Sequence, residues 1–76
     1  MSNHRRLGKR VGRRVRKLRT ESGIPVRRLA DRLQCSEQQV RRLEYGHHDP
    51  TLRTVYRVAR ALDVPVADLL PPASED

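Results

Sequence analysis

Hydrophobic and small residues recur at helical spacing through residues 26–45, in two blocks separated by a short polar stretch. Leu29 and Leu33 lie four positions apart in the first block, and Val40 and Leu43 lie three apart in the second. Each pair therefore marks one face of a helix. The small residues Ala30 and Cys35 fall at the close approach and in the turn between the two helices. The pattern predicts two short helices that cross at a steep angle.

The outer face of the second predicted helix carries only polar and aromatic side chains. If Val40 and Leu43 point inward, a rotation of about 100° per residue turns Gln38 and Tyr45 outward, with Arg41 and Arg42 on either side. Arginine and glutamine form two-pronged hydrogen bonds with the edges of guanine and adenine, and glutamate accepts from cytosine. The alternative is an ordinary solvated helix face, which does not account for the accompanying two-helix pattern. We interpret the block as a DNA-reading helix-turn-helix whose base-reading residues are Glu37, Gln38, Arg41 and Arg42.

Ser36 is expected to start this helix. A serine at the N-cap accepts a hydrogen bond from a free backbone N–H, and a glutamine three residues on, here Gln39, completes a capping box. We also expect Ser36 to contact a DNA phosphate.

Periodic apolar residues predict three further helices around this pair. The first covers about residues 7–22 and stops at Gly23, the next covers residues 52–62, and a short last helix covers about residues 65–70. The stripes expected to face the core are Leu7, Val11, Val15 and Leu18 in the first, Leu52, Val55, Val58, Ala59 and Leu62 in the next, and some of Val64, Val66, Leu69 and Leu70 in the last.

Several short motifs then follow one another at characteristic spacing: VRKLR at 15–19, GI at 23–24, LA at 29–30, LEYG at 43–46, Pro50 and Leu52, ARALDVP at 59–65 and DLL at 68–70. Over about residues 7–70 the chain therefore resembles the lambda-repressor-like, Xre/Cro-type helix-turn-helix domains. The resemblance implies a compact all-α fold of five helices, of which the second and third form the helix-turn-helix. It also implies that the third enters the major groove, usually as a homodimer on a two-fold-related site. An ion pair between Arg19 and Glu44 is implied as well.

Four positions of the family pattern are occupied differently. Pro25 and Val26 stand where the family usually has polar residues that hold a phosphate at the start of the second helix, so Arg27 and Arg28 are expected to take over that contact. Gln34 and Asp63 stand where the family prefers glycine, and a left-handed backbone costs a non-glycine residue about 1 kcal/mol or more.

Positive charge is concentrated in the first part of the chain. The formal net charge is +8 on 76 residues, and residues 1–28 hold eleven lysines and arginines against one acid. A basic end on a small fold attracts phosphates and gives salt-dependent binding. Tyr45 and Tyr56 are too few for a base-stacking platform, so duplex DNA is favoured over single strands.

We expect residues 1–6 to form a flexible basic arm, in which Arg5 and Arg6 reach along the DNA backbone or into a minor groove; a weakly interacting tail is the equal alternative. Residues 7–70 form the DNA-binding domain and residues 71–76 a short acidic tail. Near the start of the helix at 52–62, free backbone N–H groups favour a phosphate site. The residues expected there are His47, for which plain solvent exposure is the alternative, Thr51 and Arg53.

Other classes of function lack their signals. His47 and His48 are adjacent and Cys35 is distant from them, so no metal site is expected. The chain has no glycine-rich phosphate loop and no nucleophile–base arrangement, so we expect neither an enzyme nor a cofactor. A single cysteine suits a reducing compartment, and no run of 7–15 apolar residues indicates a signal peptide or membrane span. The expected location is the bacterial cytoplasm or nucleoid, without membrane binding.

The sequence therefore predicts a sequence-specific, double-stranded-DNA-binding transcriptional regulator, with repression as the expected mode and a homodimer as the expected state. Two alternatives remain. One is a protein-interaction module, such as an antitoxin or a coactivator-type helix-turn-helix domain. The other is a nonspecific nucleic-acid binder driven by the N-terminal charge alone.

Overall fold

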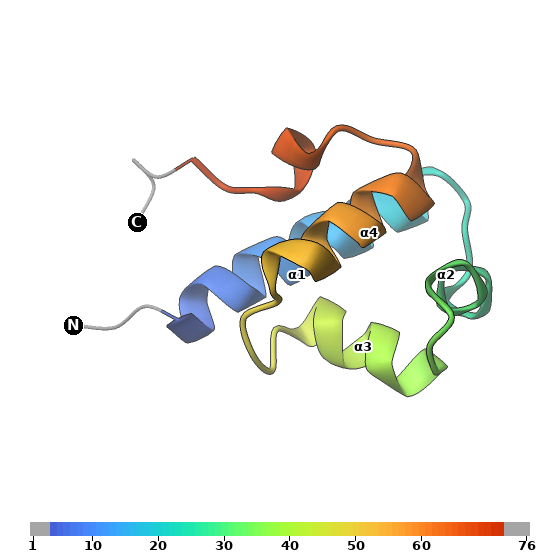
Figure 1. The fold of residues 1–76 in the computed structure, drawn as a ribbon, viewed down its shortest axis with the longest axis horizontal. Coiled ribbons are helices and arrows are strands. Elements are labelled where there is room, and N and C mark those ends of the chain that lie inside the picture. The colour runs from blue at the N-terminus through green and yellow to red at the C-terminus, as the bar shows by residue number, and fades with distance from the viewer. Residues whose placement is uncertain (1–3, 73–76) are drawn as a thin grey trace.

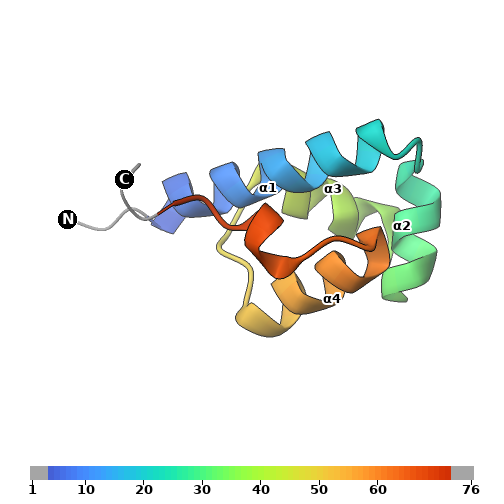
Figure 2. The ribbon, with the colours of Figure 1, turned by 90° about the horizontal axis from the view of Figure 1, so that it is seen from above.

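The computed structural model describes residues 4–72 and, within them, side chains from Leu7 onward. It contains four α-helices and a 3₁₀ turn: α1 (His4–Glu21), α2 (Val26–Leu33), α3 (Glu37–Tyr45), α4 (Leu52–Leu62) and η1 (Val66–Leu69). Helices α1 and α4 lie side by side, α2 crosses one end of this pair, and α3 and η1 cover opposite sides of it (Figures 1 and 2). The expected all-α class is confirmed.

The first helix is longer than expected. It begins at His4 rather than Leu7, so Arg5 and Arg6 lie in its first turn and not in an arm. Extending an existing helix by one residue is much easier than starting one, and arginine is a good helix former, so the helix continues beyond its apolar stripe. Residues 1–3 of the expected arm and residues 73–76 of the expected tail lie outside the described residues.

The expected fifth α-helix is a single 3₁₀ turn. Asp68 N donates to Pro65 O at 3.0 Å and Leu70 N to Ala67 O at 3.3 Å, which is the i to i+3 pattern. Only five residues separate Pro65 from Pro71, and the residue before a proline disfavours the helical region. Leu70 accordingly has an extended backbone. The segment is too short, and too closely bounded by prolines, for an α-helix.

The core draws residues from every element. Leu29, Leu69, Val15, Val40 and Val58 are the largest fully buried side chains. Because Leu69 is completely buried, the 3₁₀ turn closes the core although it is not an α-helix. Leu52 was expected in the buried stripe of α4, but its side chain is 75% exposed. It is the first residue of the helix and lies beyond the end of the core.

The ends of α2, α3 and α4 are defined by local caps. Ser36 and Gln39 form the expected capping box, and Gln34 and Asp63 take the expected left-handed backbone with φ of 57° and 59°. Two arginines add caps between helices. Arg57 donates to Leu33 O at 2.6 Å, and Arg32 donates to Ala61 O at 2.8 Å. Helices α2 and α4 thus satisfy carbonyl groups at each other's C-terminal end.

Glycines allow α1 and the end of α3 to touch backbone to backbone. A Cβ atom on Gly12 would lie 2.5 Å from the carbonyl oxygens of Leu43 and Glu44, and one on Gly46 would overlap the backbone of Lys9. No side chain fits in these gaps. The position of α3 is therefore fixed against the backbone of α1.

Candidate nucleic-acid interface

The outer face of α3 takes no part in the core. Glu37, Gln38, Arg41 and Arg42 are all exposed, whereas Val40 and Glu44 on the opposite face are buried. Tyr45, at the end of the helix, is 60% exposed, and its ring lies 6.2 Å from that of His47. The four residues expected to read bases therefore lie on one helix, and none of them packs in the core.

Two of these four residues pair with each other. Arg41 Nη2 lies 3.2 Å from Glu37 Oε1, and both side chains are about half exposed. An exposed pair at this i, i+4 spacing contributes only a few tenths of a kcal/mol. The pair holds the Arg41 guanidinium along the helix surface, and opening it costs little.

A buried ion pair attaches α3 to the scaffold. Arg19 donates from Nε to Glu44 Oε2 at 2.6 Å and from Nη2 to Glu44 Oε1 at 3.1 Å. A third bond runs from Arg19 Nη1 to Ile24 O at 2.9 Å. The hydrogen bond to Glu44 raises the pKa of Arg19 above its ordinary value, against the opposing effect of burial. The ion pair that the family resemblance implied is thus present, and it also fixes the segment that leads into α2.

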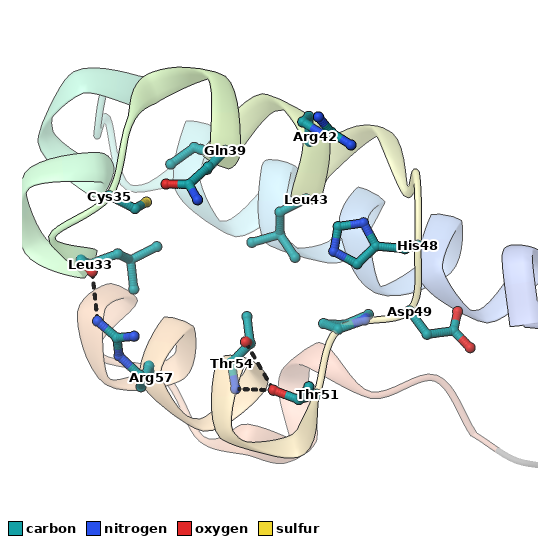
Figure 3. Close-up of a pocket in the computed structure, with 12 residues that line it drawn as sticks. Leu33, Cys35, Gln39, Arg42, Leu43, His48, Asp49, Thr51, Thr54 and Arg57 are labelled. Carbon is teal, nitrogen blue, oxygen red and sulfur yellow. Dashed lines mark hydrogen bonds between the residues drawn. The ribbon is translucent and has the colours of Figure 1, made fainter.

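A cavity of about 390 Å³ separates α3 from the N-terminus of α4 (Figure 3). Its apolar wall includes Leu33, Val40 and Leu43. Its polar lining comes from both helices and the loop between them: Gln39, Arg42, His48, Asp49, Thr51, Thr54 and Arg57. Of the predicted site residues, Arg42 and Thr51 line this cavity.

The remaining predicted phosphate contacts lie elsewhere on the surface. Arg27 and Arg28 are exposed in the first turn of α2, and Arg53 is exposed in the first turn of α4. Ser36 and His47 are exposed at the two ends of α3. None of these five residues lines the cavity, so the predicted set surrounds α3 rather than forming one pocket.

Five polar residues of the cavity were not among the predicted contacts: Gln39, His48, Asp49, Thr54 and Arg57. The sequence placed Gln39 on the flank of α3 and in the capping box, and it placed His48 in the loop, without indicating that either faces α4. Nothing in the sequence indicated the role of Arg57, because its hydrogen bond to Leu33 O depends on how α4 packs across the turn.

The hydroxyl groups at the starts of α3 and α4 serve as caps. Ser36 Oγ accepts from Gln39 N at 3.1 Å, and Thr51 Oγ1 accepts from Thr54 N at 3.1 Å. Caps of this kind satisfy one of the four free N–H groups at a helix start and leave others for an anion. An approaching phosphate would therefore meet backbone N–H groups at both positions.

Cys35 does not have the properties of a nucleophile. Its side chain is half-buried beside the core. Burial raises the pKa of the thiol above its ordinary value, and the nearby positive charge of Arg57 only partly opposes this. A protonated thiol is a poor nucleophile and a poor metal ligand.

Among the side chains that the structure describes, from Leu7 to Pro72, no three of histidine, cysteine or acidic residues gather as a metal site would require. None of the described helices has the length and apolar character needed to cross a membrane.

Comparison with known proteins places this geometry in context. A family model described as helix-turn-helix (HTH_3) matches residues 15–69. An uncharacterized HTH-type transcriptional regulator of Sinorhizobium fredii, y4dJ, is 36% identical over 69 residues, which cover 91% of this chain and 90% of that protein.

Solved structures give the same result. The restriction-modification controller protein C.AhdI of Aeromonas hydrophila is similar with a TM-score of 0.76 and 29% identity, over 82% of this chain and 94% of that one. The clp gene regulator ClgR of C. glutamicum is similar with a TM-score of 0.80 and 28% identity, over 83% and 82% of the two chains.

Proposed function

Because the chain belongs to the HTH_3 helix-turn-helix family, we propose that it is a transcriptional regulator that binds specific sequences in double-stranded DNA, with α3 in the major groove. The relatives described as regulators, among them C.AhdI and ClgR, support the regulatory role. Control of transcription by occupying an operator is the simplest mode, and repression is the expected outcome.

The observation that carries this proposal is the polar, unpacked outer face of α3. An α-helix fits the major groove of B-form DNA, and Gln38, Arg41 and Arg42 are exposed on the side of α3 that turns away from the core. A helix that bound a protein would be expected to carry an apolar anchor at its centre. Polar two-pronged side chains favour base edges instead.

Each residue has a distinct role in this proposal. Arg41 and Arg42 pair with guanine, Gln38 pairs with adenine, and Glu37 either accepts from cytosine or holds Arg41 in place. Arg27, Arg28 and Arg53 contact phosphates on either side of the groove, together with the helix starts at Ser36 and Thr51 and the loop at His47. Arg5 and Arg6 add positive charge at the start of α1.

We also propose that two copies bind a two-fold-related operator. Leu52 and Tyr56 are 75% and 58% exposed and lie four residues apart on α4, and Leu70 is 40% exposed. Residues at this spacing share one helix face. Burying them against a second copy would remove apolar surface from water, whereas a small domain alone buries a modest share of its surface.

Selection of bound duplexes from a random-sequence pool at about 150 mM salt tests the proposal directly. We expect enrichment of an inverted repeat with half-sites about one helical turn apart. Sedimentation at increasing protein concentration should show a dimer that is lost in Leu52→Asp. Enrichment of a single half-site would contradict the dimer and leave base reading in place.

Two other outcomes would favour the alternatives. Retention of DNA without enrichment would reduce the function to charge-driven binding, which should also survive Gln38→Ala. Absence of retention would favour a protein partner instead.

A further inference from the structure

The exposed face of α1 is a second cationic surface that the proposed operator contacts do not use. Lys9, Arg13, Arg16 and Lys17 are all exposed. At about 100° per residue they fall on the side of the helix opposite the buried Val11 and Val15. We call these four residues the α1 cationic face.

Positive charge exceeds negative charge on this face. Glu21 is the only acid in α1, and together with Asp68 it lines the groove at one edge of the face, beside Arg13 and Lys17. Among the described residues, no ion pair joins either carboxylate to the α1 cationic face. The neighbouring Arg14 donates to a backbone oxygen, that of Asp68, at 3.4 Å. Four positive charges therefore lie within about 12 Å of helix, open to an external anion.

The α1 cationic face and the reading face of α3 point in different directions. Viewed as in Figure 1, α3 covers one side of the α1–α4 pair and η1 covers the other; from above, α1 forms one flank of the molecule (Figure 2). Arg13 and Lys17 continue from this flank into a groove that they share with Ala67 and Asp68 at η1. The cationic surface thus extends from Lys9, which lies beside Gly46 at the end of α3, toward the side away from α3.

The chemistry of the face favours a nucleic-acid backbone. Protein partners are usually held by buried aromatic or aliphatic anchors, and an amphipathic helix binds a membrane through a wide apolar face. The α1 cationic face carries neither: its exposed uncharged neighbour on the helix is Thr20, and only Leu18 and Ala67 add apolar surface in the adjoining groove. Duplex DNA presents one phosphate per about 1.7 Å of axis, so the length of the face spans about seven phosphates.

We propose that the α1 cationic face binds the backbone of a second DNA duplex, independently of its sequence, while α3 holds the operator. One bound protomer would then bridge two segments of DNA. This inference rests on the proposed function, because the first segment is the operator held by α3. With four phosphate contacts, binding of the second duplex should weaken roughly 150-fold between 50 and 200 mM salt.

The test uses an operator duplex obtained from the selection and fixed to beads. The full-length protein is bound and excess is washed away, and a labelled 40-bp duplex of unrelated sequence is added at about 50 mM salt. We expect the wild-type protein to capture the second duplex. The variant K9Q/R13Q/R16Q/K17Q should capture at least about tenfold less, while its operator affinity at 150 mM salt stays within about threefold.

A charge-preserving variant, K9R/R13K/R16K/K17R, is the matched control. Because lysine and arginine both deliver a positive charge to phosphate, it should capture the second duplex as the wild type does. Undiminished capture by the glutamine variant would overturn the proposal. So would a parallel loss of operator affinity, since the face would then contact the flanks of the operator itself.

A second arm does not depend on base reading. In Q38A/R41A/R42A the reading face is disabled, but Arg27, Arg28 and Arg53 still contact phosphates, so a random-sequence duplex should still bind. Adding the four glutamine substitutions should reduce the magnitude of the salt slope by about 3.6, the share of four phosphate contacts. If no operator exists but this reduction is measured, the reading function fails and the cationic face stands. A slope that the four substitutions leave unchanged overturns the cationic face alone.

Discussion

At the scale of single residues, the strongest constraint on α3 is the buried contact between Arg19 and Glu44. Removing one partner leaves the other charged, buried and without its two-pronged bond. We expect Arg19→Met to lower the free energy of unfolding by about 3–5 kcal/mol. Urea denaturation followed by circular dichroism measures this change.

The double variant R19M/E44L separates the charge effect from the packing effect. Replacing both partners by apolar residues removes the unpaired charge, so most of the lost stability should return. If the double variant were as unstable as the single one, the contribution of the pair would lie in its shape and in the bond from Arg19 to Ile24 O.

Arg42 and Arg27 should respond differently to truncation. Arg42→Ala should weaken operator binding by about 1–3 kcal/mol and relax the preference at one or two base positions. Arg27→Ala should weaken binding to all duplexes alike and flatten the salt slope by about one. Repeating the duplex selection with each variant distinguishes them. A uniform loss in Arg42→Ala would assign Arg42 to a phosphate.

The thiol of Cys35 provides a test of the packing around the turn. Its raised pKa means that less thiolate is present in the folded protein than in the unfolded chain at mildly alkaline pH. Alkylation by iodoacetamide should therefore be slower in the folded state near pH 8, and the two rates should converge as the pH rises above the folded pKa. Equal rates at pH 8 would indicate an open turn.

At the scale of the elements, the contact between α1 and α3 depends on Gly12. A methyl group there would meet two carbonyl oxygens of α3 at 2.5 Å, and backbone atoms cannot move aside as a side chain can. Gly12→Ala should cost about 2–3 kcal/mol of stability. Gly23→Ala is the control, because it meets open space and costs only the left-handed conformation, about 1 kcal/mol. Thermal melting compares the two variants. Equal losses would mean that the helices separate easily.

Periodicity and capping chemistry predicted α2, α3 and α4 well. Each has an apolar stripe, and the serine or threonine caps of α3 and α4 depend on local sequence alone. The left-handed residues after α2 and α4 were inferred from the family resemblance. The start of α1 at His4 and the 3₁₀ form of η1 were missed. In α1, the helix propensity of the preceding residues extends the helix beyond its apolar stripe. In η1, the flanking prolines keep the segment too short for an α-helix.

The candidate site was predictable only in part. The exposed face of α3 follows from helix geometry, so the exposure of Gln38, Arg41 and Arg42 was predicted from the sequence. The cavity between α3 and α4 depends on the angle at which two helices pack, which no local pattern encodes. The hydrogen bond from Arg57 to the turn and the exposure of Leu52 also depend on how the helices pack, so the local sequence did not predict them.

At the scale of the whole molecule, the net charge of +8 should oppose folding at low salt. Raising the salt from about 20 to 200 mM screens repulsion between exposed charges, whereas the buried Arg19–Glu44 pair is screened much less. We expect the free energy of unfolding to increase by about 1 kcal/mol, which raises the melting temperature of a domain this size by several degrees. A lower melting temperature at high salt would show that attractive surface pairs dominate.

On α3, the residues that hold the helix in the fold are different from the residues on its exposed outer face, and this difference affects which substitutions the protein tolerates. Val40 and Glu44 hold the helix against the rest of the fold, and none of the four outward side chains is buried in the core. Exchanging those four leaves no void and no buried unpaired charge, so the fold should tolerate it. Under the proposed function, such exchanges would change the DNA sequence that is bound, and grafting those four positions alone should retarget the protein.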